Sequence, residues 1–384
     1  MGPDIVERAL SIGCSRLRVL DPMMGSGTTL VWSRIYGHTA FGVDRDPLAV
    51  LIATSSTRDL DVRTYVKEAD EALLRARKLA ALISQAEAYP TGADDETKKY
   101  VRYWFDVRAR TQLAALVRVL SRNDFETLTH LKLALSRMIV TKSHGVSLAL
   151  DASHSRPHRD KDWKQAPTSP FEAFPRQVKA IAERSLFTTP RSHGPIPRIV
   201  EGDCRRLHYP REFFDLVITS PPYLNAIDYL RGHKLSLVWL GYSAEAIRDL
   251  RSTNVGADCG IESGRWDDII ETMLLRKTNV PNALIRKVRR YASDLDRMMG
   301  QIARVTRCNG KIIMVVGDCT IRGVEVRNSY GVVAAAERHD LTLVHRRIRR
   351  IKDASRYLPP PAARFSEGQI ANRMRHEVVL EFRP

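Results

Sequence analysis

The chain has 384 residues, of which 43% are hydrophobic, so it can bury the core of one large domain or of two ordinary ones. Lys and Arg number 61 against 44 Asp and Glu, and the resulting formal charge of +17 favours nucleic acid as a partner. The five cysteines form no CxxC pair and no Cys-His spacing typical of zinc, so we expect no metal site and reduced thiols in a cytoplasmic protein. The first 20 residues contain neither a signal peptide nor a membrane span.

The first predicted elements alternate between strand and helix. An apolar run at 17–20 predicts a strand, a glycine-rich turn follows, and 28–36 has the pattern of a helix. A second strand is predicted at 39–43, and Pro47 begins another helix at a position where proline is tolerated. This order predicts the beginning of an α/β sheet.

Helical periodicity then dominates the chain from 62 to about 186, which predicts a large insertion before the third strand. Within it, 100–120 and 127–140 are predicted amphipathic helices, whereas 143–170 is polar, basic and irregular. We therefore expect a helical insertion at 61–194, inserted into a sheet domain. The expected parts of the sheet domain are 1–60 and 195–384.

Strand patterns resume after the insertion and alternate with helical ones. They lie at 199–200, 214–219, 311–316, 341–347 and 377–382. Apolar residues at helical spacing between 285 and 305 predict a helix before the strand at 311–316, and Asn309-Gly310 is the turn expected to end it. Such alternation predicts a parallel or mixed sheet with helices on both faces.

The glycine-rich loop after the first predicted strand is the first candidate site. Its sequence is Asp21-Pro22-Met23-Met24-Gly25-Ser26-Gly27-Thr28-Thr29. Glycines let a ligand approach the backbone closely, and the helix that follows offers unpaired N–H groups. Asp44, at the end of the second predicted strand, lies 17 residues after Gly27, about where nucleotide-binding α/β folds place a ribose-binding carboxylate.

A second candidate loop follows the apolar strand at 214–219 and has the sequence Ser220-Pro221-Pro222-Tyr223. Its prolines restrict the backbone, so the neighbouring carbonyls point in fixed directions instead of pairing within the sheet. Ser220 and the Pro221 carbonyl are then expected to accept the two N–H protons of an exocyclic amino group, which localises the nitrogen lone pair for attack. Tyr223 is expected to stack on a base extruded from its duplex.

Together, DPMMGSGTT and TSPPY resemble the two motifs of the amino-methyltransferases of DNA, which use S-adenosylmethionine (AdoMet) to modify cytosine N4 or adenine N6. The resemblance implies a Rossmann-like class I methyltransferase fold, with a mostly parallel seven-stranded sheet and a large helical insertion. It implies that Asp21 places the methionine part of AdoMet and that Asp44 holds its ribose. The cofactor-binding residues it implies are Asp21, Pro22, Met23, Gly25, Ser26, Gly27, Thr28, Thr29, Asp44 and Asp203.

Asp203 follows the predicted strand at 199–200, where the family has an Asp that binds the adenine amino group of the cofactor. A turn formed by Gly202-Asp203 is the alternative interpretation. The resemblance also implies that Ser220, Pro221, Pro222 and Tyr223 are catalytic, in a direct in-line displacement without metal or covalent intermediate. Methylation of a cytosine ring carbon instead needs a cysteine nucleophile, typically after a proline, and the chain has no Pro-Cys pair.

The sequence departs from the family pattern in two ways. The glycine motif precedes the Ser-Pro-Pro-Tyr motif, whereas the permuted order is common among cytosine-N4 enzymes, so the substrate base is not inherited with the resemblance. The family's segment that cradles the methionine carboxylate normally precedes the first strand. Residues 4–12 are either a short form of that segment, or the chain is truncated.

The segment of the insertion that follows 150 is our candidate for target recognition. It combines donors for base edges with partners for phosphates, and a solvated surface loop is an equally weighted alternative. The candidate nucleic-acid-binding residues are His154, Arg156, His158, Arg159 and Lys161.

The preferred hypothesis is a methyltransferase that acts on cytosine N4 in double-stranded DNA, with the target base flipped out. Adenine-N6 methylation of DNA is the nearest alternative. Methylation of RNA, for example at a guanine amino group of transfer RNA, and an inactive DNA-binding protein of the same fold are further alternatives. The sequence leaves open the recognised site, the oligomeric state and any accompanying restriction endonuclease.

Overall fold

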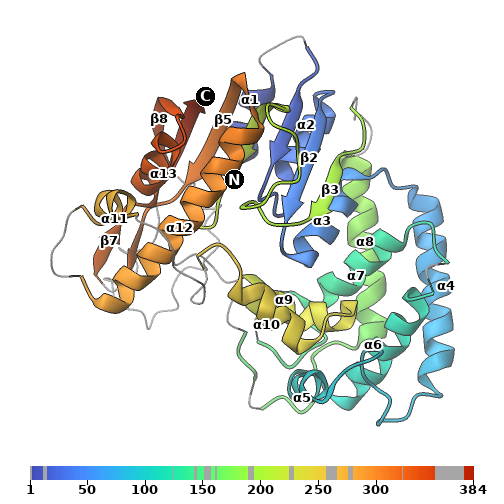
Figure 1. Ribbon diagram of the computed structural model, residues 1–384. Helices are drawn as coiled ribbons and strands as arrows, with labels where there is room; N and C mark the ends of the chain where they lie inside the picture. The colour runs from blue at the N-terminus through green and yellow to red at the C-terminus, as the bar shows by residue number, and fades with distance from the viewer. Residues whose placement is uncertain are drawn as a thin grey trace. The chain divides into compact units, whose positions relative to one another are not determined.

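The computed structural model of the protein describes most of the chain. The described residues are 2–11, 15–122, 124–141, 145–150, 157–160, 162–188, 194–224, 229–256, 266–275, 280–321, 323–350 and 376–384. They form two compact units (Figure 1). The sheet unit contains Met1–Arg45, His193–Ala226 and Ser252–Pro384, and the helical unit contains Asp46–Ser192 and Ile227–Arg251.

The sheet unit is built on a seven-stranded sheet with the strand order β3-β2-β1-β4-β5-β9-β8. Its strands are β1 (Arg18–Asp21), β2 (Thr39–Asp44), β3 (Arg198–Glu201), β4 (Phe214–Thr219), β5 (Thr306–Val316), β8 (Thr342–Arg350) and β9 (His376–Arg383). Within this sheet β9 runs antiparallel to its two neighbours, and the other described pairings are parallel. The predicted fold class, a mostly parallel seven-stranded sheet, is confirmed.

Helices cover both faces of this sheet, which explains why β4 is apolar along most of its length. On one face, α1 (Pro3–Leu10) and α2 (Thr28–Ile35) cover a cluster that includes Leu216 and Ile218 of β4. On the other face, α11 (Asp267–Leu274), α12 (Asn282–Val305) and α13 (Asn328–Glu337) cover a larger cluster that includes Phe214 and Val217. From Leu216 onward, successive residues of β4 therefore enter different cores, as expected of a central strand.

The helix predicted before the fifth strand is α12, and its predicted apolar face is buried against the sheet. The expected turn at Asn309-Gly310 is wrong, because α12 ends at Val305 and both residues lie within β5. Thr306 already pairs with Phe214 of β4. The backbone pairing with β4 outweighs the local turn preference of an Asn-Gly pair. A short hairpin of β6 (Cys319–Ile321) and β7 (Val324–Val326) follows β5.

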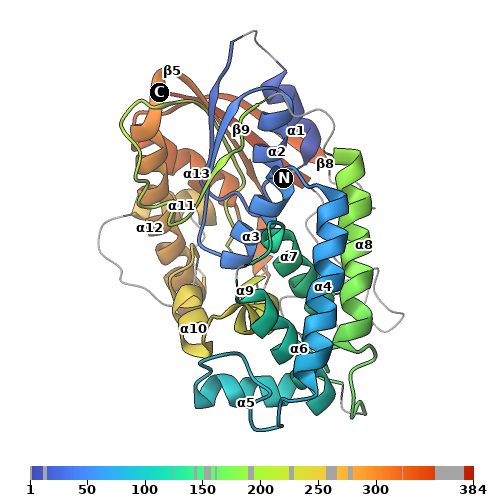
Figure 2. The same ribbon diagram turned by 90° about the vertical axis from the view of Figure 1, so that its right-hand side faces the viewer.

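The described elements of the helical unit are all helices. Its elements are α3 (Pro47–Thr57), α4 (Val62–Ala80), α5 (Asp95–Trp104), α6 (Val107–Leu120), α7 (Leu128–Ile139), α8 (Pro170–Thr188), α9 (Tyr229–Leu237), η1 (Val238–Leu240) and α10 (Ala244–Ser252). Figure 2 shows α4 and α8 side by side. The single helix expected at 100–120 is instead α5 and α6, because Phe105 is extended and Asp106 caps α6 by accepting a hydrogen bond from the Ala109 amide at 2.9 Å.

The segment 227–251 packs into the helical unit, although the expected boundaries place it with the sheet. Trp239 is fully buried there and contacts Phe105 edge-on, with ring centroids 5.5 Å apart. Ser236 donates a hydrogen bond to the Ser136 hydroxyl at 2.8 Å. The helical unit is thus assembled from two stretches of the chain. No helix of the described residues is long and apolar enough to cross a membrane.

Candidate functional site

The glycine-rich loop lies against the carboxyl end of β2, next to Asp44. Gly25 and Gly27 have φ values of +51° and +83°, a region that side chains other than glycine rarely adopt. The Gly25 amide donates a hydrogen bond to Oδ2 of Asp44 at 2.9 Å, so the loop and the predicted ribose-binding carboxylate lie together. Gly42 of β2 permits this approach, since a Cβ atom there would overlap Met24.

Asp21 connects the two candidate loops. Its side chain is buried, and Oδ1 accepts hydrogen bonds from the Thr219 hydroxyl at 2.8 Å and from the Met23 amide at 3.2 Å. Burial raises the pKa of Asp21, and these hydrogen bonds oppose part of the shift. Thr219 is the last residue of β4 and directly precedes Ser220. The end of β1 is thereby bonded to the start of the Ser-Pro-Pro-Tyr loop.

The Ser-Pro-Pro-Tyr loop is held by hydrogen bonds from both sides. The Ser220 hydroxyl donates to the Val315 carbonyl of β5 at 2.9 Å and lies 3.4 Å from the Tyr223 hydroxyl. The Tyr291 hydroxyl, on α12, donates to the Pro222 carbonyl at 2.9 Å. Burial raises the pKa of Tyr291 well above its ordinary value, so that it remains a donor.

Two acceptors of this loop remain available. A hydroxyl that donates its proton keeps its oxygen lone pairs, so Ser220 can accept a further hydrogen bond while it is held by β5. Among the described residues, no group donates to the Pro221 carbonyl. The loop therefore presents a hydroxyl oxygen and a carbonyl oxygen as acceptors on neighbouring residues.

Both loops lie at the carboxyl edge of the sheet, after adjacent parallel strands. Leu20 of β1 pairs with Val217 of β4, and β1 has β2 on its other side. The strand order therefore reverses between β1 and β4, and open α/β sheets bind ligands in the crevice outside this point. Neighbouring strands are only about 4.8 Å apart, so a ligand at the glycine loop is within reach of Ser220.

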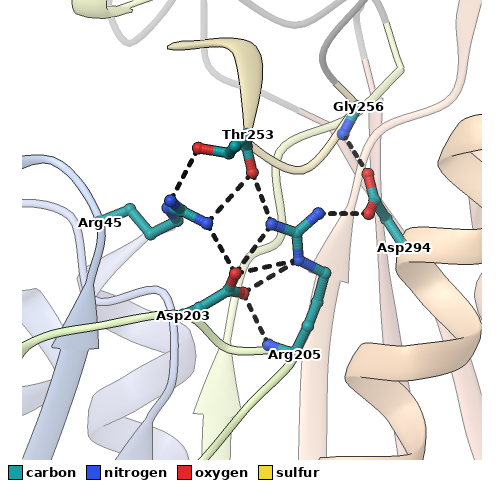
Figure 3. Close-up of polar contacts among 6 residues, drawn as sticks. All are labelled: Arg45, Asp203, Arg205, Thr253, Gly256 and Asp294. Atoms are coloured by element: carbon teal, nitrogen blue, oxygen red, sulfur yellow. Dashed lines mark hydrogen bonds and ion pairs between the residues drawn. The ribbon is translucent and has the colours of Figure 1, made fainter. Parts of the chain in front are cut away.

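Asp203, the predicted ligand of the cofactor adenine, belongs to an ion network at the ends of β2 and β3 (Figure 3). Arg205 donates to Asp203 through its backbone amide at 2.9 Å and through Nε at 3.0 Å and Nη2 at 2.8 Å. Arg45 donates to Oδ2 at 2.7 Å. Burial alone would raise the pKa of Asp203, but Arg205 and Arg45 outweigh it, and the pKa is lowered.

The same network extends to α12 and to the segment after α10. Arg205 donates to Oδ1 of Asp294 at 2.5 Å, and the two side chains are only 11% and 8% exposed. Oδ2 of Asp294 accepts from the Gly256 amide at 2.8 Å, and the Thr253 carbonyl accepts from Arg205. A carboxylate offers about four lone-pair sites, and those of Asp203 are already engaged. This geometry favours a supporting role for Asp203 over a direct hydrogen bond to a ligand.

The remaining candidate residues take no part in the hydrogen bonds described above. In the glycine loop, Ser26 is exposed, whereas Pro22 and Thr29 are buried. In the helical unit, the Arg159 guanidinium lies over the Tyr103 ring at 5.0 Å, and His158 is exposed. The other three candidate nucleic-acid-binding residues lie outside the described residues, namely His154, Arg156 and Lys161. Among the described residues, no group of three or more His, Cys, Asp or Glu could hold a metal ion.

The sequence alone did not identify several residues that hold the site. They are Arg45, Thr219, Arg205, Tyr291 and Asp294. Tyr291 and Asp294 lie on α12, whose periodicity indicates only packing against the sheet. The sequence did contain one signal for Asp294, because a charged residue on the buried face of a helix requires a partner.

The chain is similar in sequence to methyltransferases. It is 20% identical over 364 residues to the type II methyltransferase M.MvaI of Kocuria varians, covering 85% of this chain and 75% of the relative. It is 22% identical over 353 residues to the type II methyltransferase M.AvaI of Nostoc sp., covering 80% and 70%. The type II methyltransferase M.BsoBI of Geobacillus stearothermophilus is 21% identical over 273 residues, which cover 64% of this chain and 51% of that protein.

Family profiles and solved structures give less information about this chain than the sequence relatives do. No family profile matches the chain. An S-adenosylmethionine-dependent methyltransferase from Mesorhizobium loti aligns over the whole of both chains with 9% identity and a TM-score of 0.34. The YcgJ protein of Bacillus subtilis aligns over 99% of this chain and 97% of its own, with 8% identity and a TM-score of 0.36. Superpositions with TM-scores this low carry no argument about function.

Proposed function

We propose that this protein is an AdoMet-dependent DNA methyltransferase that transfers a methyl group to the exocyclic amino group of cytosine, at N4. The observation that carries the proposal is the hydrogen bond between Asp21 and Thr219, which joins the glycine loop to the Ser-Pro-Pro-Tyr loop. The sequence similarity to type II methyltransferases supports methyl transfer to DNA, with adenine N6 as the alternative target.

The residues at the glycine loop fit AdoMet as the cofactor. A Cβ atom built at Gly25 meets no atom within 4 Å, so the space beside the loop is open. Backbone N–H groups at the start of α2 and the carboxylate of Asp44 provide a donor set and an acceptor, which suit the carboxylate and ribose of the methionine nucleoside. When bound there, AdoMet would supply an electrophilic methyl group on a sulfonium.

The Ser-Pro-Pro-Tyr loop would then act on the amino group of the target base. Ser220 and the Pro221 carbonyl would accept hydrogen bonds from its two N–H groups, which draws the nitrogen lone pair out of the ring system so that it can attack a methyl group; the methylated nitrogen would then release one proton to solvent. Val315 and Tyr291 hold the loop so that these acceptors need no rearrangement as charge develops. Tyr223 provides an aromatic face for the flipped base.

The ion network around Asp203 has a supporting role in this proposal. It ties Arg45, which directly follows Asp44, to the end of β3 and to α12. The network therefore keeps Asp44 in place beside the glycine loop, and contact between Asp203 and the cofactor adenine would require an exchange of hydrogen bonds.

The experiment that tests the proposal is transfer of a labelled methyl group from AdoMet to duplex DNA and to RNA, followed by identification of the modified nucleoside. We expect label in DNA as N4-methylcytosine. N6-methyladenine would move the proposal to the alternative base, and label only in RNA would contradict it.

A Ser220→Ala variant tests the catalytic assignment in the same assay. Loss of one of two acceptors for developing charge should lower kcat roughly 100-fold. AdoMet binding should remain unchanged, because Ser220 does not belong to the glycine loop. Ser84→Ala, a substitution in the helical unit, is the matched control and should retain full activity. A Ser220→Ala variant as fast as the wild type would remove Ser220 from the mechanism.

A further inference from the structure

The edge strand β8 is unusually basic. Its last six residues are His345, Arg346, Arg347, Ile348, Arg349 and Arg350, and all but Arg349 are exposed. Among the described residues the strand pairs with β9 on one side only, so within this part of the chain its other edge has no sheet partner for its backbone N–H groups. Four arginines on one exposed strand create a strong local positive potential.

Two of these arginines contact other side chains, whereas the other two have no ion-pair partner within the described part of the chain. Arg346 lies over the Tyr330 ring at 4.0 Å and donates to the Ser329 hydroxyl at 3.1 Å, and Arg349 pairs with Asp4 at 2.9 Å. Among the described residues, no carboxylate pairs with Arg347 or Arg350. These two guanidinium groups are available to an anionic partner.

The sheet register places this basic strand near the candidate site. Thr219 at the end of β4 pairs with Met314 of β5. Met314 pairs with Leu380 of β9, and Leu380 pairs with Arg346 of β8. Three strand spacings of about 4.8 Å separate β4 from β8, so Arg346 lies roughly 14 Å across the sheet from Thr219.

β8 is also oriented toward the carboxyl edge of the sheet. It runs parallel to β4 and β5, and the register places Arg347 level with Val315, one position after the partner of Thr219, and Arg350 beyond the end of β5. The major groove of DNA is about 12 Å wide, so a duplex with one base at Ser220 has phosphates at a comparable distance across the sheet.

We infer that the outer edge of β8 is a binding surface for the phosphate backbone of duplex DNA, with Arg347 and Arg350, which extend from opposite faces of the strand and flank this edge, as the contacting residues. This inference rests on the proposed function for the location of the target base. The contact is electrostatic and independent of base sequence, since guanidinium groups bind phosphates in any sequence context. It would position the duplex while other residues select the site.

The charge of β8 argues against a second copy of this chain as the occupant. Two copies paired through this edge would bring eight arginines together, and like charges opposite each other destabilise strand pairing. Exposed Ile348, with a relative exposure of 66%, offers only a single apolar contact. A polyanion satisfies both the guanidinium groups and the free N–H groups of the edge.

The test compares an Arg347→Gln/Arg350→Gln variant with the wild type in binding to a short fluorescent DNA duplex, by anisotropy, between about 50 and 200 mM salt. Each lost phosphate contact lowers the slope of log K against log salt by about 0.9, so the double variant should lose about 1.8. Arg347→Lys/Arg350→Lys should retain most of the slope, because charge alone is needed. Thermal unfolding and AdoMet binding should match the wild type.

The matched control is Arg16→Gln/Arg211→Gln, which removes the same charge from exposed positions before β1 and β4, at the opposite edge of the sheet. Its slope should equal that of the wild type. Equal slopes for all variants, in an enzyme that methylates DNA, overturn this inference and leave the proposed function standing. A wild type that binds no duplex at low salt overturns the inference, and the methyl-transfer assay then decides the proposed function separately.

Discussion

Oδ1 of Asp21 accepts a hydrogen bond from the Thr219 hydroxyl at 2.8 Å, although 198 positions separate the two residues in the chain. The bond joins the ends of two adjacent parallel strands, and each strand leads directly into one of the two candidate loops. Because both groups are buried, neither can exchange its partner for water. The distance between the two loops therefore depends on this pair.

Thr219→Val should separate the role of this bond from that of simple packing. The variant keeps the shape of the side chain but removes the donor to Asp21, and we expect a loss of about 1–3 kcal/mol in the free energy of unfolding. Activity should fall in kcat more than in AdoMet affinity, because the glycine loop keeps its own hydrogen bonds. Thr272→Val, at an exposed threonine of α11, is the control and should leave kcat unchanged. Equal kcat in Thr219→Val and wild type would contradict the coupling of the loops.

The raised pKa of Asp21 predicts a pH-dependent effect of Asp21→Asn. Its folded-state pKa lies above 3.8, so the folded protein binds this proton more tightly than the unfolded chain does. The stability contributed by protonated Asp21 is fully present below about pH 3.8, the ordinary pKa of the group, and is lost as the pH rises through the folded pKa. Asparagine keeps the acceptor and has no charge, so the variant should gain stability relative to the wild type between about pH 4 and pH 7. Thermal midpoints of both proteins across this range give the measurement, and a constant difference would contradict the assignment.

Removal of Arg205 should destabilise the sheet unit strongly. Arg205→Ala leaves Asp294 buried without its charged partner, and breaking one side of a buried ion pair costs about 3–5 kcal/mol. Urea unfolding measures this loss, with Arg206→Ala at the exposed neighbouring position as the control. Asp294→Asn in the Arg205→Ala background should recover part of the stability, because it removes the unpaired charge. A loss below about 1 kcal/mol would show that water replaces the guanidinium.

His130 predicts acid sensitivity in the helical unit. Its ring is buried, Nε2 lies 3.1 Å from the Ser55 carbonyl, and burial lowers its pKa below 6.5. The unfolded chain therefore takes up this proton first as the pH falls, so the stability contribution is present above about pH 6.5 and is lost as the pH falls through the folded pKa. The slope for one proton is at most about 1.4 kcal/mol per pH unit. His130→Gln should remove this component from unfolding curves recorded between about pH 5 and pH 8, and an unchanged pH dependence would assign it elsewhere.

The sequence by itself determined the strands that carry the site and the loops that follow them. The strand at 214–219 was predicted with the bounds that the structure has, because its apolar residues must be buried on both faces. The glycines at 25 and 27 indicated a loop that a ligand can approach closely, and the structure adds that both have positive φ. These features are local, so a short stretch of sequence contains all the information that they require.

Tertiary structure alone decided which distant groups meet. The bond from Thr219 to Asp21, the ion pair of Asp203 with Arg45 and the packing of Trp239 against Phe105 all join segments far apart in the chain. The pair Asn309-Gly310, predicted as a turn, became part of β5 for the same reason, since Thr306 and Lys311 on either side of it pair with residues of β4. The type of a buried polar or charged residue indicates that it needs a partner, and only the packing of the whole chain determines which partner it has.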